Sequence, residues 1–265
     1  MKRSTRIENA PLDLYDPDEP RLGRRESEPH SAEITYIYDI LTTNFPDSRT
    51  IWDLHHYFTA HKDPLKGQKI DIQFDISFFK NLSIPHTLSS YKAKDFDDRV
   101  PDLAINVLSK STWRADLSEN VDICKSLGIS VYVVFSPYKV TSKVYHPPFM
   151  RAYILREDGS YEQIDLYGVT LKKEESINEK NSIKLNEKLP FHLGLMKLDK
   201  QHEGGSSLYR LVFLDHSNLT LLLTEIEQIK KEKEQIKKEK TIAEKKVKEL
   251  QEKIQEMQTK TKNKN

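Results

Sequence analysis

The residues best suited to chemistry are two aspartates on one predicted strand. Apolar and polar residues alternate strictly from Ile70 to Phe78. A strand repeats every two residues, so Asp71 and Asp75 are expected to share one polar face. Carboxylates that share one face of a strand can line a cleft. The alternative is a strand edge that simply faces solvent.

A second candidate is the amide of Asn106, which interrupts the apolar run Leu103–Leu108. This run has the length and composition of a buried strand. A buried amide must find hydrogen-bond partners, so Asn106 is expected to have a specific structural or functional role.

The elements around Asn106 predict how it is positioned. After a polar turn, Leu117, Val121 and Cys124 recur at helical spacing, and Gly128 ends the pattern. A second apolar run follows at 129–135. Two buried strands joined by a helix form a βαβ unit, which predicts parallel strands and a right-handed connection.

The rest of the chain predicts further strands and one helix around this unit. Ser31 is expected to cap a helix that runs to Asn44, and Asp158-Gly159 is expected to form a hairpin turn. Two apolar segments, 189–198 and 207–214, suit edge strands, whereas 51–60 is ambiguous. Polar segments without periodicity, which we expect to be loops, are 83–99 and 172–188. We therefore expect a mixed α/β fold with a sheet of five or six strands.

Composition argues against disulfide-linked, multi-cysteine zinc and membrane-spanning proteins. The 265 residues carry a net charge of +1 and one cysteine, Cys124, which excludes an intramolecular disulfide and a multi-cysteine zinc site. No apolar run is long enough to span a membrane, so we expect no membrane partner. No apolar segment follows the N-terminal MKRSTR, which predicts no signal peptide and a cytoplasmic location.

The C-terminal region carries a heptad repeat, because EQIKKEK occurs twice in tandem over 227–240. The d positions are Leu222, Ile229, Ile236, Ala243, Leu250 and Met257, and the a positions are Ile226, Lys233, Lys240, Val247 and Ile254. This pattern predicts a coiled coil that joins copies of the chain into a homo-oligomer. Lysine at two a positions leaves a lone charged helix as the alternative.

The stretch PDLAINVLSKSTWRADLSENVDI resembles the signature of the Uma-two family of restriction endonucleases, within the PD-(D/E)XK nuclease superfamily. The residues that stand in register are Pro101, Asp102, Val107, Leu108, Ser109, Ser111, Thr112, Asp116, Leu117, Gly128 and Pro137. Outside this stretch, 26–30 is similar to an E-S-x-x-H element of some members, and Phe74-Asp75 to the family's Pro-Asp strand. The resemblance covers most of the chain.

The resemblance implies a restriction-endonuclease-like core that hydrolyses DNA phosphodiesters with Mg²⁺ or Mn²⁺. Asp75 matches the first acidic metal ligand and Glu26 the N-terminal acid, while Asn106 stands where the family has a second carboxylate. Asn120 stands where many members have lysine, and Lys110 in the nearby turn is the better substitute for that charge. An amide oxygen can bind a cation but brings no negative charge, so metal binding should be weakened.

Three functional interpretations remain open at this point. The chain is a divergent nuclease with weakened metal chemistry, a nuclease fold that binds nucleic acid or protein without cleavage, or a scaffold whose coiled coil is the functional part. The expected organisation is a flexible tail (1–29), a restriction-endonuclease-like domain (30–217), a coiled coil (218–258) and a disordered tail (259–265).

Overall fold

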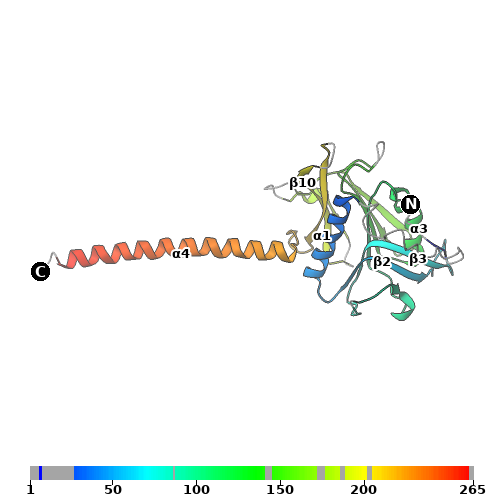
Figure 1. Cartoon of the computed structure of the whole chain (residues 1–265), viewed down its shortest axis with the longest axis horizontal. Coiled ribbons are helices and arrows are strands. Elements are labelled where there is room, and N and C mark those ends of the chain that lie inside the picture. Colours follow the sequence, from blue (N-terminus) through cyan, green and yellow to red (C-terminus); the bar gives the residue numbers. More distant parts are fainter. Residues whose placement is uncertain are drawn as a thin grey trace, which may run out of the picture. The chain divides into compact units, whose positions relative to one another are not determined.

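We analysed a computed structural model, in which residues 6–7, 27–85, 87–140, 145–171, 177–185, 189–201 and 205–262 are described. The chain divides into two compact units, Met1–Leu222 and Leu223–Asn265 (Figure 1). Each unit is described by itself.

The first unit is built on a sheet in which the central strands are buried. In spatial order its strands are β4 (Tyr91–Lys92), β2 (Arg49–Thr59), β3 (Lys69–Phe79), β5 (Leu103–Val107), β6 (Val131–Ser136), β7 (Phe149–Leu155) and β8 (Tyr161–Leu166). A short β1 (Arg6–Ile7) also pairs with β3. The pairs β2–β4 and β5–β6 are parallel and the others antiparallel, which confirms the expected mixed fold.

The predicted βαβ unit is present. After β5 the chain forms one turn of helix, α2 (Trp113–Asp116), then α3 (Glu119–Leu127), before it returns in β6. Gly128 ends α3 with a φ of 78°, and its N–H and that of Ile129 bond carbonyls of the last turn. Glycine adopts this left-handed conformation without steric cost, which explains the sharp end of the helix.

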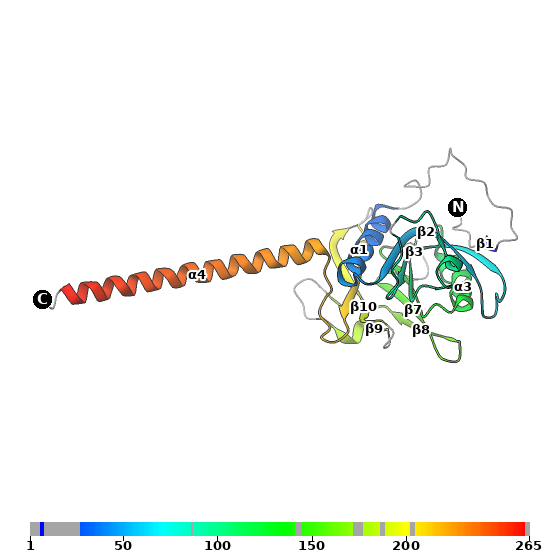
Figure 2. The same ribbon diagram turned by 90° about the horizontal axis from the view of Figure 1, so that it is seen from below.

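Two hydrophobic clusters cover opposite faces of this sheet. Helix α1 (Glu28–Asn44) contributes Ile34, Ile37 and Leu41 to one cluster. Helix α3 contributes Ile123, Cys124 and Leu127 to the other. Figures 1 and 2 show α1 and α3 on either side of the strands. The prediction that α1 begins after Ser31 is wrong, because Ser27 is its N-cap and Pro29 lies in its first turn.

A second sheet replaces the predicted edge strands. It has the order β11 (Ser207–Asp215), β10 (Phe191–Gln201) and β9 (Ser182–Lys184). Leu193, Leu195 and Phe213 from this sheet join the cluster that contains α1. The sequence predicted one sheet of five or six strands, whereas the described residues form one sheet of eight strands and a second of three. Two predicted loops also carry structure: 83–99 contains β4 and η1 (Ala93–Asp95), and 172–188 contains η2 (Glu179–Asn181) and β9.

Strand β3 changes its surroundings halfway along its length. Ile70, Ile72 and Phe74 belong to the cluster that contains α3, whereas Ile76 and Phe78 belong to the cluster that contains α1. The change occurs at Asp75. The neighbouring strand β2 is irregular at this level, because the ladder passes from Trp52↔Ile76 to Leu54↔Phe74 without a pair at Asp53, whose φ is 49°.

The second unit is the 38-residue helix α4 (Glu225–Lys262). Thr224 and Glu227 form a capping box, in which each side chain accepts the other's backbone N–H at 3.3 and 2.9 Å. Apolar side chains along the helix, including Ile229, Ile236 and Leu250, are exposed. Among the described residues, no helix combines the length and apolar character needed to cross a lipid bilayer.

Candidate functional site

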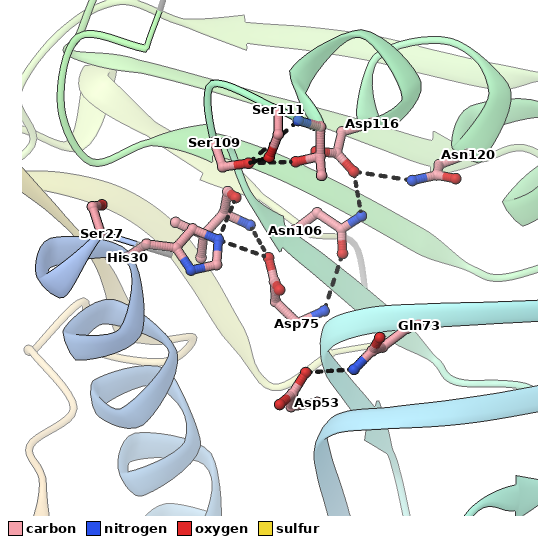
Figure 3. A network of polar contacts seen from close by, with 12 residues as sticks. Ser27, His30, Asp53, Gln73, Asp75, Asn106, Ser109, Ser111, Asp116 and Asn120 are labelled. Atoms are coloured by element: carbon pink, nitrogen blue, oxygen red, sulfur yellow. Dashed lines mark hydrogen bonds and ion pairs between the residues drawn. The ribbon is translucent and has the colours of Figure 1, made fainter. Parts of the chain in front are cut away.

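The candidate site lies where β3 and β5 separate. Main-chain pairing between these strands ends at Ile76↔Ile105. Beyond that point side chains continue the contact, because the Asp75 N–H donates to Asn106 Oδ1 at 3.1 Å and the Val107 N–H donates to Asp75 Oδ2 at 2.7 Å. Figure 3 shows Asp75 and Asn106 facing each other across this gap. The two side chains thus satisfy two backbone donors that the ladder leaves open.

The amide of Asn106 has a defined orientation. Its Oδ1 accepts from Asp75, and its Nδ2 donates to Asp116 Oδ1 at 2.8 Å and to the Tyr132 hydroxyl at 3.2 Å. A carboxylate has no donor for Asp116, so the amide is the group that fits between an N–H and a carboxylate. The prediction that Asn106 has a specific role is consistent with these bonds.

Asp116 is the centre of the network. Asn120 lies one turn later on α3, and its Nδ2 donates to the same Oδ1 of Asp116 at 3.0 Å (Figure 3). The Tyr132 hydroxyl donates to the backbone carbonyl of Asp116 at 2.9 Å. Hydrogen bonds from neutral amides stabilise a buried carboxylate, but less than an ammonium group does. Two asparagines therefore surround a single buried acid.

His30 closes the network from the first turn of α1. Its Nε2 lies 2.9 Å from the Val107 carbonyl and 3.5 Å from Asp75 Oδ2. The bond to a carbonyl, which only accepts, assigns a proton to Nε2. This contact attaches α1 to the end of β5.

The network is buried throughout: Asp75 is 1% exposed, Asn106 0%, Asp116 1% and Asn120 3%. The expectation that the polar residues of β3 share an open face is therefore wrong for Asp75. Asp71 remains partly exposed and bonds His55 at 2.8 Å. The two aspartates thus lie in different environments: Asp75 is buried beside His30 of α1, whereas Asp71 pairs with His55 at a partly exposed position.

Of the remaining predicted site residues, Lys110 lies outside this network. Lys110 is exposed in the turn after β5. Its neighbour Ser109 instead bonds Ser111 and Thr112 within the turn, at 3.1 and 2.8 Å. Glu26 lies outside the described residues.

The arrangement of carboxylate and amide oxygens in this network does not fit a magnesium ion. The oxygen of Asn106 accepts from Asp75, Asp75 Oδ2 accepts from Val107, and Asp116 Oδ1 accepts two amides. Within the ranges that the structure describes, no three His, Cys, Asp or Glu side chains are grouped so that they could hold a metal. Mg²⁺ needs several oxygen ligands that converge at about 2 Å, and these oxygens are directed at protein donors instead.

Sequence reasoning gave no role to three members of the network: His30, Asp116 and Tyr132. The resemblance included His30 in the E-S-x-x-H element and Asp116 in the signature, but as matches only. His30 carried a signal, since it precedes Ile34, Ile37 and Leu41 on the buried face of α1 at helical spacing. Asp116 follows the turn after β5 but lies on a helix too short to show periodicity. Nothing in the sequence distinguishes Tyr132 from other apolar residues of β6.

Part of the chain is similar to known proteins. Residues 54–171 match the model of the Uma2 family, described as "Putative restriction endonuclease". The structure resembles the crystal structure of a "putative nuclease belonging to DUF820" from Anabaena variabilis ATCC 29413. The identity is 16% and the TM-score 0.39, over 55% of this chain and 71% of that chain. A search of curated proteins gave no match. The resemblance to the Uma-two family is thereby confirmed for residues 54–171.

Proposed function

We propose that this chain binds DNA through a restriction-endonuclease-like domain in which metal-dependent phosphodiester hydrolysis is weak or lost. The match to the Uma2 family supports the nuclease class of the domain. The observation that argues against efficient cleavage is the amide of Asn106, whose oxygen and nitrogen both bond protein groups.

Charge supports the same proposal. A cation in this network would meet the carboxylates of Asp75 and Asp116, while the amides of Asn106 and Asn120 bring no charge. Removing one negative ligand lowers the electrostatic attraction for a divalent ion. Asn120 bonds Asp116 with a neutral amide, which cannot offset charge on a reacting phosphate as the ammonium group of a lysine would.

The nuclease assay gives the first prediction. At millimolar Mg²⁺ or Mn²⁺, we expect the wild-type protein to cleave DNA slowly or not at all. The double variant Asn106→Glu, Asn120→Lys should cleave faster, because it restores a carboxylate and an ammonium group next to Asp116. Cleavage is measured on labelled duplex and single-stranded DNA. We propose that any activity requires one of these two ions.

Single variants and Asp75 provide the controls for this assay. Asn120→Lys alone restores only one of the two charges and should raise cleavage less than the double variant. Asp75→Ala in the double variant should abolish the gain. Robust cleavage by the wild-type protein that disappears with Asp75→Ala would contradict the proposed loss of activity.

We propose further that α4 joins copies of the chain through a coiled coil. The exposed apolar residues at d positions, Ile229, Ile236 and Leu250, support a partner for this stripe. Ile236→Lys should shift the full-length protein from oligomer to monomer in sedimentation velocity. The matched control is Ile242→Lys, because Ile242 is as exposed (66% against 63%) but lies off the a and d positions.

The same pair of variants separates assembly from DNA binding. If Ile236→Lys changes the oligomeric state and leaves DNA affinity unchanged, the helix serves assembly. A monomeric wild-type protein, or an equal effect of both variants, would contradict the coiled coil. Loss of DNA binding by Ile236→Lys would show that DNA binding requires the assembled protein. An oligomeric wild type that binds no DNA would favour the second candidate function, a scaffold in which the coiled coil is the functional part.

A further inference from the structure

A row of aromatic rings runs across the first unit from the turn after β5 to the end of β8. The ring centroids of Trp113 and Tyr145 lie 6.1 Å apart, those of Tyr145 and Phe149 4.8 Å, and those of Phe149 and Tyr167 5.5 Å. We call these four residues the aromatic row. Its members differ in exposure: Tyr167 is 58% exposed, Trp113 and Tyr145 are partly buried, and Phe149 is buried.

Two arginines lie over this row. The Arg114 guanidinium is 4.6 Å from the centroid of Trp113, and Arg114 is exposed. The Arg151 guanidinium lies 5.3 Å from Tyr145 and 5.7 Å from Phe149. Because Arg114 is exposed, the face of its guanidinium that is turned away from Trp113 stays accessible to a ligand. Arg151 differs, since its side chain is only 12% exposed and donates to Asp165.

The carboxylate of Asp165, which lies beside this row, is paired with Arg151. Asp165 accepts two hydrogen bonds from Arg151, at 2.6 Å from Nε and 2.7 Å from the terminal nitrogen. The Tyr167 hydroxyl donates to the same carboxylate at 3.3 Å. The ring of Tyr167 is thereby held at its hydroxyl end, while much of the side chain remains exposed. An ordered, exposed ring loses little conformational entropy when a ligand stacks on it.

We propose that the aromatic row binds single-stranded nucleic acid, with bases stacked on Tyr167 and on the outer face of Arg114, and with phosphates paired to Arg114. One exposed ring, Tyr167, and one exposed guanidinium, Arg114, offer stacking and charge to unpaired bases, because every base has a π-face and every nucleotide a negative charge. A duplex hides those faces within its stack. A single strand therefore fits this surface better than a duplex.

The position of the row connects it with the candidate site. Trp113 begins α2, the same helical turn that ends with Asp116. The exposed Lys110 lies in the turn that leads into this helix. The inference deepens the proposed function, on which it rests: it names unpaired strands as the ligand of the domain and the aromatic row as their path past Asp116.

The test uses the full-length protein without divalent metal, so that cleavage plays no part. The chain has two tryptophans, and Trp52→Phe leaves Trp113 as the reporter. Addition of oligo(dT) is expected to quench the fluorescence of Trp113 saturably, and oligo(U) should act in the same way. A duplex of equal length should bind more weakly.

Variants of the row sharpen the test. Tyr167→Ala should weaken oligo(dT) binding roughly tenfold, as expected for loss of one base–ring stack. Arg114→Ala should reduce the slope of log affinity against log salt by about one, as expected for loss of one phosphate contact. The matched control is Tyr57→Ala on β2, because Tyr57 is also exposed (38%) but lies outside the row.

Two results would overturn the inference: no quenching of Trp113 by single strands while a duplex binds, or equal effects of Tyr167→Ala and Tyr57→Ala. The first of these would leave the proposed DNA binding intact. Binding of neither single strands nor duplex would refute the proposed function as well.

Discussion

Replacement of Asn106 by aspartate is expected to lower the free energy of unfolding by about 3 kcal/mol at pH 7. The substitution keeps the shape of the side chain but replaces Nδ2, which lies 2.8 Å from Asp116 Oδ1, with oxygen. Two carboxylates would then face each other in a site that is 0–1% exposed. Like charges at this distance cannot both remain ionised without a large cost. Urea unfolding at pH 7 measures the change.

The same variant should depend on pH in a defined direction. A proton on the introduced carboxyl group restores a donor to Asp116, so the folded protein holds this proton to a pH above the ordinary range of a carboxyl group. A group with a raised pKa in the folded state stabilises at low pH and loses this contribution as the pH rises. The deficit of the variant should therefore shrink from pH 7 to pH 5.

The matched control for this experiment is Asn218→Asp. Asn218 is exposed, and its side-chain oxygen accepts from the N–H and hydroxyl of Thr220 at 2.9 and 2.7 Å. An aspartate keeps both bonds, so stability should hardly change. An Asn106→Asp protein as stable as the wild type at pH 7 would show that the orientation of the Asn106 amide is wrong.

Acidification of the wild-type protein is expected to remove about 3 kcal/mol of stability through His56 alone. Burial lowers the pKa of His56 from 6.5 to about 4. Its Nδ1–H donates to the Leu54 carbonyl at 2.7 Å, so Nε2 is the neutral acceptor for the Ser77 hydroxyl at 2.7 Å. The rings of Phe58, Phe74 and Tyr91 surround it and offer no counter-charge.

The sign follows from proton uptake. Between pH 6.5 and 4 the unfolded chain protonates this imidazole and the folded protein does not, so stability falls as the pH falls through this window. His56→Phe should flatten the dependence of the unfolding free energy on pH. An equal slope in wild type and His56→Phe would refute this explanation.

Local sequence patterns predicted the βαβ unit correctly, but they did not predict strand β2 or the second sheet. The βαβ unit was correct because its apolar runs, its helical spacing and Gly128 all act within a few residues of one another. The sequence left residues 51–60 ambiguous, although most of them belong to β2 (Arg49–Thr59). The reason is that His55, His56 and Tyr57 interrupt the alternation of apolar and polar residues. The second sheet was missed as a separate layer, since no local signal states which sheet β10 and β11 join.

The sequence predicted several residues of the candidate site but not their burial. The sequence identified Asp75, Asn106 and Asn120, and the structure brings them into one hydrogen-bonded network with Asp116. The burial of Asp75 was not predictable from β3, because it depends on His30, which lies 45 positions earlier in the chain. Whether these residues act on DNA stays a prediction.

The separation of β3 and β5 also bears on how the fold selects one alignment of its strands. Their ladder contains only three pairs, and Ile76, Phe78, Leu103 and Ile105 are all apolar. A slip by two residues would keep each side chain on its own face, so packing alone specifies the alignment weakly. The bonds that join Asp75 with Asn106 and Val107 form in only one register. Even without catalysis, this polar pair would fix the strand register at the centre of the domain.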